Sequence, residues 1–464
     1  MHTFDFGHPS HVHFIGIGGI SMSGLAEILM DKGFSVSGSD NRASELTKHL
    51  EERGALVYIG QRASNIPGDT AAVVYTAAVH PDNEEYAAAV SRGLPLLSRA
   101  ELLGSLMRNY RTSIAVAGTH GKTTTTSMAA SILMAGGYDP TISVGGMLPS
   151  IGGNIRVGGT DVFLTEACEY TNSFLSFYPT AGLILNIEED HLDFFRDLDD
   201  IRHSFRLFAE NIPSDGVLVI SSDIQSYQDI TMGLPCRVVT FGRSTDADYT
   251  YSDAEYDGYG RASFTLIRNG AQDGRFTLSV PGEHNILNAL AAAALSDALG
   301  IDRSAAVSGL ASFSGTDRRF QYKGKVCGFT VIDDYAHHPT EIRATLNAAA
   351  RCPHNEIWCV FQPHTYSRTR AFLHEFADAL ALSDHVVLAD IYAARETDTL
   401  GMSSALIRDL LREKGVDAYY FPSFGEIEQF LSASCREGDI CITMGAGNVV
   451  DIGEDLVRGQ GERQ

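Results

Sequence analysis

The segment GTHGKT, residues 118–123, contains residue types that bind nucleotide phosphates. It is shorter than the usual G-x-x-x-x-G-K-[ST] loop, because Val116 stands where the first glycine would be. A glycine turn before a helix still directs backbone N–H groups toward an anion, while Lys122 adds a positive charge and Thr123 offers a hydroxyl to Mg²⁺. The alternative is an ordinary turn that caps a helix. We predict a phosphate site formed by Gly118, Thr119, His120, Gly121, Lys122, Thr123 and Thr124.

Two residues beyond this loop are candidate metal ligands. Glu166 ends the apolar run of FLTEACEY, where its carboxylate could join Thr123 on an ion between the phosphates. His191 in NIEEDHLD ends the next apolar run and could hold a second ion. Two divalent ions suit a reaction that brings two anions together. Either residue alone could equally be a surface acid or a capping histidine, and Glu169 is a competing ligand.

A second glycine loop lies near the N-terminus, in HFIGIGGISMSG. Asp40 follows it by about 20 residues, as a ribose-binding acid would in a dinucleotide site. The G-x-G-x-x-G pattern fails at Ser21, however, so binding of NAD is the weaker interpretation. The loop still suits a pyrophosphate group.

An apolar run, a polar loop and a helix-like segment follow one another three times, at residues 12–33, 113–137 and 356–380. Such units build α/β sheets with ligands at the carboxyl ends of the strands. We therefore predict an N-terminal Rossmann-like domain, a central P-loop ATPase-like parallel sheet and a C-terminal Rossmann-like domain, at residues 1–108, 109–313 and 314–464. Two runs in which apolar and polar residues alternate flank Asn269-Gly270, and they predict a β-hairpin.

Composition excludes several classes of protein. A net charge of −23 argues against nucleic acid as a partner. No apolar run approaches the ~20 residues of a membrane helix, and the N-terminus does not resemble a signal peptide, so we expect a cytoplasmic protein without membrane association. The seven scattered cysteines are expected to be free thiols.

Several motifs resemble, in order, those of the Mur ligase family, the ATP-dependent amide-forming enzymes of peptidoglycan synthesis. They are GTHGKTTT, TEACEYTNSFLSFYP, NIEEDHLD, GEHNILNALAAA, DDYAHHPTE and FQPHTYSRTR. The EACEY form and HFIGIGG with GSD are similar to the alanine-adding branch. Several relatives use a carbamylated lysine near the second metal. No lysine occurs here between Lys122 and Lys323, which agrees with that branch.

The resemblance implies two nucleotide sites. The first domain would bind the UDP of a sugar nucleotide through Gly16, Gly18, Gly19, Ser39, Asp40, Thr76 and Ala77. The phosphate loop would bind ATP, with further contacts from His284, Asn285, Asn288, Arg319, Asp334 and His338. Without the resemblance, Asn285 would be read as a helix cap. The implied catalytic residues are Lys122, Glu166, His191 and Arg319. Two Mg²⁺ ions, for which Mn²⁺ could substitute, would be bound by Thr123, Glu166 and His191.

The last domain is expected to bind the incoming amino acid and to close over ATP. Its implied contacts are Tyr335, His364 and Arg368, of which Arg368 would pair with the carboxylate. Many relatives have arginine directly after the histidine, whereas this chain has Thr365. Arg370 is a possible substitute for that missing cation.

The resemblance implies ligation of L-alanine to the lactyl carboxylate of UDP-N-acetylmuramic acid through an acyl phosphate, in cytoplasmic peptidoglycan precursor synthesis. A histidine would accept the amine proton, and the protein would be a monomer or weak homodimer. One rival is the family's recycling ligase, which takes a peptide. The others are an oxidoreductase or sensor that binds NAD at the first loop, and a scaffold without activity.

Overall fold

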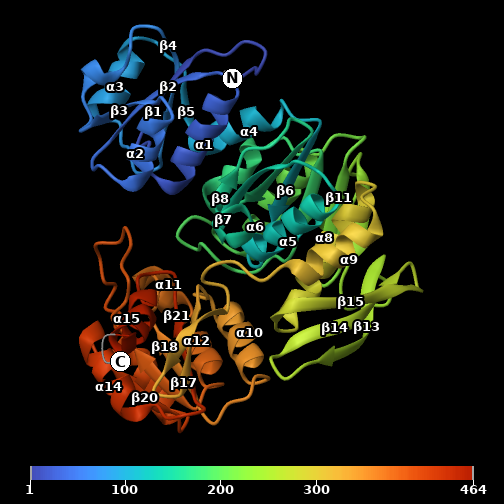
Figure 1. The fold of residues 1–464 in the computed structure, drawn as a ribbon, viewed down its shortest axis with the longest axis vertical. Helices are drawn as coiled ribbons and strands as arrows, with labels where there is room; N and C mark the ends of the chain where they lie inside the picture. Colours follow the sequence, from blue (N-terminus) through green and yellow to red (C-terminus); the bar gives the residue numbers. More distant parts are fainter. Residues whose placement is uncertain (1–2, 462–464) are drawn as a thin grey trace. The chain divides into compact units, whose positions relative to one another are not determined.

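The computed structural model describes residues 3–461 and contains three β-sheets interleaved with helices (Figure 1). Three such sheets confirm the predicted α/β class. The chain forms two compact units. The first contains the chain up to Ile187 with Asp199–Phe241 and Ala291–Gly309, and the second contains Glu188–Leu198, Gly242–Leu290 and the chain from Leu310. The domain limits drawn from the sequence stay predictions.

The N-terminal sheet of the first unit is parallel, in the order β3-β2-β1-β4-β5. Residues 12–15 of β1 are all buried, so helices must cover both faces of the sheet. Strands β2 and β3 lie on one side of β1, and β4 and β5 lie on the other, so the strand order reverses at β1. The first glycine loop, which follows β1, therefore lies at the topological switch point of the sheet. The elements are β1 His11–Ile15, α1 Ile20–Asp31, β2 Ser35–Asp40, α2 Glu45–Glu52, β3 Leu56–Ile59, β4 Thr70–Tyr75, α3 Glu84–Ser91, β5 Leu96–Ser98 and α4 Arg99–Met107.

The second sheet of this unit has the order β12-β11-β10-β6-β9-β7-β8 and is parallel except for β8. Strand β6 lies between β10 and β9, so the loop that leaves β6 is flanked by the ends of both neighbours. The elements are β6 Thr112–Ala117, α5 Lys122–Ala135, β7 Thr141–Leu148, β8 Gly153–Arg156, β9 Val162–Ala167, β10 Ala181–Ile184, α6 Leu198–Glu210, β11 Val217–Ser221, α7 Tyr227–Thr231 and β12 Arg237–Phe241.

An antiparallel meander begins the larger part of the second unit. It consists of β13 Tyr249–Tyr256, β14 Arg261–Arg268 and β15 Ala271–Pro281. Asn269 and Gly270 connect β14 to β15 with φ angles of 49° and 78°. Positive φ at both central residues is the requirement of a type I′ turn, which explains the Asn-Gly pair. The predicted hairpin is confirmed. Helices α8 His284–Ala298 and α9 Arg303–Ser312 follow.

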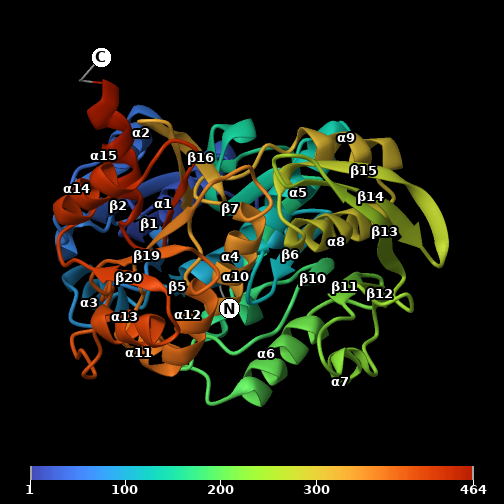
Figure 2. The same ribbon diagram turned by 90° about the horizontal axis from the view of Figure 1, so that it is seen from below.

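The C-terminal sheet has the order β16-β17-β21-β18-β19-β20, with only β16 antiparallel. Alternate residues of β18 enter two apolar clusters: Cys359 packs with α10, α12 and α13, and Val360 packs with α14 and α15. Helices thus cover both faces (Figure 2). The elements are β16 Gln321–Val326, β17 Phe329–Asp334, α10 Pro339–Ala349, β18 Ile357–Phe361, α11 Tyr366–Ala371, α12 Leu373–Leu380, β19 His385–Leu388, α13 Ser404–Glu413, β20 Asp417–Tyr420, α14 Phe424–Ser434, β21 Ile440–Met444 and α15 Val450–Gly461.

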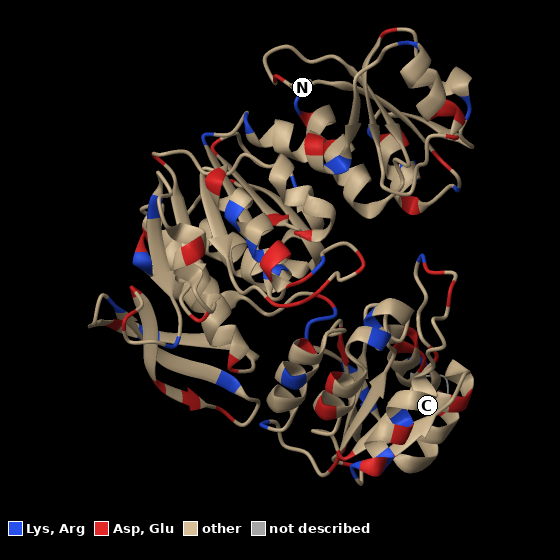
Figure 3. Cartoon of the chain, turned by 180° about the vertical axis from the view of Figure 1, so that it is seen from behind, with Lys and Arg blue, Asp and Glu red and all other residues tan. Residues whose placement is uncertain are grey.

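Charge is distributed widely over the chain. Asp and Glu occur on helices and loops of both units (Figure 3) and give the formal net charge of −23. None of the described helices is both long and apolar enough to cross a membrane.

Close packing of α9 on α5 generates a prediction about stability. A Cβ atom added at Gly309 would lie 2.6 Å from the Cα atom of Ile132. Gly459 in α15 has nothing within 4 Å of the same position. Alanine normally favours a helix by about 1 kcal/mol over glycine, whereas overpacking costs about 1–3 kcal/mol. We expect Gly309→Ala to lower, and Gly459→Ala to maintain or raise, the melting midpoint followed by circular dichroism. Equal midpoints would contradict the packing.

Candidate active site

The short phosphate loop depends on two glycines between β6 and α5. Gly118 has φ of 144° and Gly121 has φ of 81°, a region that other residues rarely adopt. A Cβ atom at Gly118 would also lie 2.9 Å from the Cβ atom of Leu185. The loop therefore folds tightly against the end of β10 and leads into the N-terminus of α5, whose positive dipole end favours anions. His120 and Thr124 lie in this loop and in the first turn of the helix.

Asn186 holds the loop and was not singled out by sequence reasoning. Its Oδ1 accepts from the N–H of His120 at 2.7 Å, and its Nδ2 donates to the carbonyl of His120 at 3.1 Å. Its own carbonyl accepts from the N–H of Thr119 at 3.2 Å. The available signal was its position directly after the apolar run of β10, on a strand that neighbours β6.

Lys122 is held by the loop and by an acid from the next strand. Its Nζ donates to the carbonyls of Gly118 and Thr119 at 2.5 and 3.1 Å and to Glu169 Oε2 at 2.9 Å. The side chains of Lys122 and Glu169 are 16% and 2% exposed. Burial disfavours the charged amine, but the nearby Glu169, Cys168 and Glu166 outweigh it and raise the pKa of Lys122. The lysine is therefore charged and oriented before phosphate arrives.

Thr123 and Glu166 come together as the sequence predicted. The hydroxyl of Thr123 donates to Glu166 Oε2 at 3.1 Å, and the N–H of Gly145 donates to Oε1 at 2.5 Å. A Cβ atom at Gly145 would lie 2.9 Å from the carboxylate, so glycine gives that carboxylate its space. A hydroxyl and a carboxylate are hard oxygen donors, which is the set that Mg²⁺ prefers. These residues fit a magnesium ion beside the loop.

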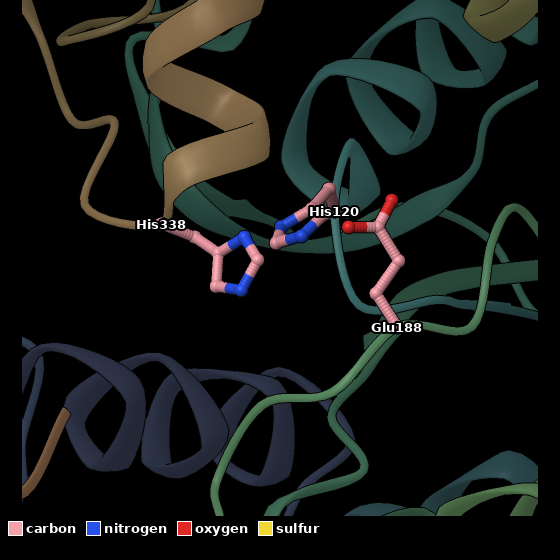
Figure 4. A group of neighbouring side chains, drawn as sticks. All are labelled: His120, Glu188 and His338. Carbon is pink, nitrogen blue, oxygen red and sulfur yellow. The ribbon is translucent and has the colours of Figure 1, made fainter. Parts of the chain in front are cut away.

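His191 belongs to the second unit, in the segment after β10. It has φ of 53°, and its N–H donates to Asp190 Oδ1 at 2.7 Å. In this unit His338 directly precedes α10 (Figure 4). Its Nδ1 accepts from the N–H of Thr340 at 3.3 Å, and its Nε2 lies 3.1 Å from the carbonyl of Glu189. An imidazole nitrogen binds divalent transition metals, whereas Mg²⁺ prefers oxygen donors.

The residues proposed for adenine begin α8. Asn285 and Asn288 are buried, and their amides are linked by a 3.0 Å hydrogen bond. Asn285 Nδ2 also donates to the carbonyl of Pro281 at 2.7 Å. Burial, with a smaller contribution from Arg319, lowers the pKa of His284 to about 4, so its ring is neutral. A linked pair of amides beside a neutral ring could read the edge of a base.

The paired arginines of the DRRF segment have different roles. Arg318 donates to Asp333 at 3.0 Å and to the carbonyls of Gly445 and Gly447, so it ties β17 to the loop after β21. Arg319 lies over the ring of Tyr335 at 5.2 Å and 3.9 Å from Glu341. Arg318 therefore has a structural role between strands, whereas Arg319 makes an ion pair with Glu341.

Asp334 ends β17 and supports the adjacent turns. Its two oxygens accept from the N–H groups of Phe320 and Ala336, both at 2.8 Å. Burial raises the pKa of Asp334 to about 6, although Arg319 acts in the opposite direction. A carboxylate with both oxygens already engaged can still accept from a ribose hydroxyl, because each oxygen has a second lone pair.

Arg368 in α11 pairs with Asp190. Its Nε and Nη2 donate to Asp190 Oδ1 at 3.1 and 2.7 Å, and its Nη1 donates to the carbonyl of His364 at 2.9 Å. The two charged side chains are 10% and 7% exposed. Burial disfavours the ionised carboxyl, but Arg368 outweighs it and holds the pKa of Asp190 far below its usual range. Sequence reasoning used His191 and missed Asp190 beside it.

Aromatic rings surround this ion pair. His364 stacks on Tyr392 with ring centres 5.6 Å apart, and His337 lies edge-on to both His364 and Tyr335 at 5.9 and 5.4 Å. Burial lowers the pKa of His337 to about 3 and that of His364 to about 4, where Arg368 contributes. The rings are therefore neutral at physiological pH, and Arg368 supplies the positive charge.

Thr365, which departs from the family pattern, and Arg370, its possible substitute in the predicted amino-acid clamp, differ in placement. Thr365 donates to Glu396 at 2.8 Å. Arg370 is exposed on α11 and is not part of the contacts around Asp190. Of the two arginines of α11, only Arg368 contacts Asp190 and His364.

The first glycine loop is held by residues predicted to bind UDP. Asp40 accepts from the N–H of Gly18 at 2.9 Å, and Gly16 would contact the methyl of Thr76 if it carried a Cβ atom. The hydroxyl of Ser39 is buried and donates to Glu85. Of the remaining predicted residues, Gly19 precedes α1 and Ala77 is exposed after β4.

Models of one protein family match almost the whole chain. The Mur ligase family catalytic domain matches residues 11–111, the Mur ligase middle domain matches 116–296, and the Mur ligase glutamate ligase domain matches 318–447.

Individual proteins extend this match to full length. The chain is 60% identical to a UDP-N-acetylmuramate–L-alanine ligase of Agathobacter rectalis, over 99% of this chain and 100% of that protein. It is 57% identical to the protein of that name from Lachnospira eligens, with the same coverage. A solved UDP-N-acetylmuramate-alanine ligase of Thermotoga maritima is 32% identical with a TM-score of 0.81 and covers 98% of this chain and 100% of its own. The chain belongs to the Mur ligase family.

Proposed function

We infer that this chain joins L-alanine to the lactyl carboxylate of UDP-N-acetylmuramic acid, with hydrolysis of ATP, in peptidoglycan precursor synthesis. The observation that carries this function is the 60% identity over 99% of the chain to a UDP-N-acetylmuramate–L-alanine ligase. The phosphate loop adds a physical reason for ATP, because a free carboxylate forms no amide in water without activation. The proposed activated species is an acyl phosphate.

Lys122 and the loop amides are proposed to bind the β and γ phosphates of ATP. Phosphate would then replace the carbonyls and Glu169 as partners of the lysine, whose charge is already in place. Thr123 and Glu166 would hold Mg²⁺, and His191 would hold a second divalent ion. When bound, these ions offset the repulsion between the attacking carboxylate and the γ-phosphate.

The second unit is proposed to supply the remaining contacts. His284, Asn285 and Asn288 would face adenine, Asp334 would face the ribose, His338 would lie near the nucleotide, and Arg319 would stabilise the charge that develops on the transferred phosphoryl group. Tyr335, His364 and Arg368 would hold the amino acid. UDP is proposed to bind the first glycine loop. We further propose a cytoplasmic location, where its nucleotide substrates occur, and a monomer or weak homodimer.

The direct test is phosphate release from ATP and Mg²⁺ with UDP-N-acetylmuramic acid, with and without L-alanine. Release that requires both the sugar nucleotide and alanine supports the proposal. Release only with L-alanyl-γ-D-glutamyl-diaminopimelate in place of alanine would identify a recycling ligase. Turnover of NADH, followed by absorbance, would favour the oxidoreductase interpretation of the first loop.

Removal of the loop lysine tests the phosphate site. We expect Lys122→Ala to lower the rate of phosphate release at least about 100-fold, since a fixed charge on the phosphates is lost. The single variant leaves Glu169 buried without its partner, so the double variant Lys122→Ala, Glu169→Gln is measured beside it. The exposed Lys48→Ala is the control. Near-normal activity of the double variant would contradict the assignment.

The proposed magnesium ligand is tested by titration of the ion. We expect no phosphate release in EDTA, and recovery with Mg²⁺ or Mn²⁺. In Glu166→Gln the Mg²⁺ concentration for half-maximal activity should rise by about tenfold or more, because a charged ligand becomes neutral. The exposed Glu52→Gln serves as control. An unchanged Mg²⁺ titration for Glu166→Gln would move the ion elsewhere.

Two arginines of one helix form a matched pair for the amino-acid site. Arg368→Ala should raise KM for L-alanine by about 10- to 100-fold, the loss of a charge-assisted hydrogen bond. KM for ATP should change little. The exposed Arg370→Ala should leave KM for alanine unchanged, and an equal rise in both variants would show that two cations bind the carboxylate.

A further inference from the structure

One carboxylate oxygen of Asp190, Oδ2, takes no part in the ion pair with Arg368. Arg368 and the N–H of His191 all donate to Oδ1. Among the residues that the structure describes, none donates a hydrogen bond to Oδ2, and Nε2 of His191 lies 3.8 Å from it. A carboxylate oxygen of a side chain that is only 7% exposed has little access to water, so a hydrogen-bond donor at Oδ2 would be favourable.

Arg368 likewise retains donor capacity beside this oxygen. Of its five N–H groups, at most four are engaged, two by Asp190 and two by His364. A partly unused cation thus lies directly against a partly unused anion. This is the charge pattern of an α-amino acid, whose ammonium and carboxylate are separated by a single carbon.

Rings of the same unit lie beside Arg368. His364 contacts its guanidinium, and the ring centre of His337 lies 5.9 Å from that of His364 and 5.4 Å from that of Tyr335. Other charged groups also reach these rings: Arg318 and Arg319 lie over Tyr335, and Glu341 lies 3.4 Å from His337. Asp190 and Arg368 differ from them because an anion and a cation are in direct contact, as the two ends of an amino acid require.

We propose that Asp190 and Arg368 together recognise the amino-acid zwitterion, with Asp190 Oδ2 accepting from the ammonium and Arg368 donating to the carboxylate. This rests on the proposed function and extends it, because Asp190 becomes a binding residue for the amine. It also predicts that the amine and the carboxylate are recognised by separable contacts.

The test compares L-alanine with L-alaninamide, which keeps the ammonium and lacks the carboxylate. KM is measured for alanine, and the inhibition constant against alanine is measured for alaninamide. Asp190→Asn should raise both constants by about 10- to 100-fold. Arg368→Ala should raise the constant for alanine while changing that for alaninamide less than threefold. The control Glu454→Gln removes an ion pair with Lys323 in the same unit and should change neither constant.

Three outcomes would overturn the inference while wild-type activity stands. One is a rise for alanine alone in Asp190→Asn, which would mean that Asp190 only orients Arg368. Another is a change in the Mg²⁺ titration of Asp190→Asn while the constants for alanine and alaninamide stay unchanged. Asp190 would then support His191 in binding the ion and would not contact the amino acid. The third is a variant without effect. A wild-type protein without activity toward alanine would instead overturn the proposed function.

If Asp190→Asn does not fold, the wild-type protein still tests the proposal. L-lactate keeps the carboxylate and replaces the ammonium with a hydroxyl. Its inhibition constant against alanine should exceed the KM of alanine by at least about tenfold, because the charged contact to Asp190 is missing. An inhibition constant within threefold of that KM would show that the ammonium is not recognised.

Discussion

The first unit must hold a positive charge at the end of β6 before any phosphate is bound. Lys122 is 16% exposed, and a cation this far from water requires anionic and carbonyl partners. Those partners come from the loop itself and from Glu169 after β9. The strand order β10-β6-β9 is what supplies them, since it sets Asn186 on one side of the loop and Glu166 and Glu169 on the other.

The second unit meets the same constraint with a different cation. Arg368 is 10% exposed and is neutralised by Asp190. Breaking such a pair is costly because one charge is left buried alone. The neighbouring His337 and His364 remain neutral, so the charge that compensates Asp190 comes mainly from Arg368. A substrate that carries both charges can satisfy this pair without leaving either partner uncompensated.

Much of the fold and of the site followed from local sequence patterns. The Asn269-Gly270 turn, the alanine-rich α8 and the three strand–loop–helix units depend on backbone preferences and apolar periodicity within a few residues. Asn186 and Asp190 were missed for a common reason. Asn186 contacts a residue 66 positions away, and Asp190 contacts one 178 positions away, so neither partner is visible from local spacing.

The sequence by itself determined the phosphate-binding chemistry, because the glycines, lysine and threonine of a phosphate loop are adjacent in the chain and their chemistry is local, and the order of its motifs indicated the family and hence the reaction class. Only the tertiary structure decided how similar residues divide their roles. Glu166 accepts from Thr123 whereas Glu169 accepts from Lys122, and Arg318 pairs with Asp333 of β17 whereas Arg319 pairs with Glu341 of α10. Charges pair according to distance through space, and which strands are neighbours sets that distance.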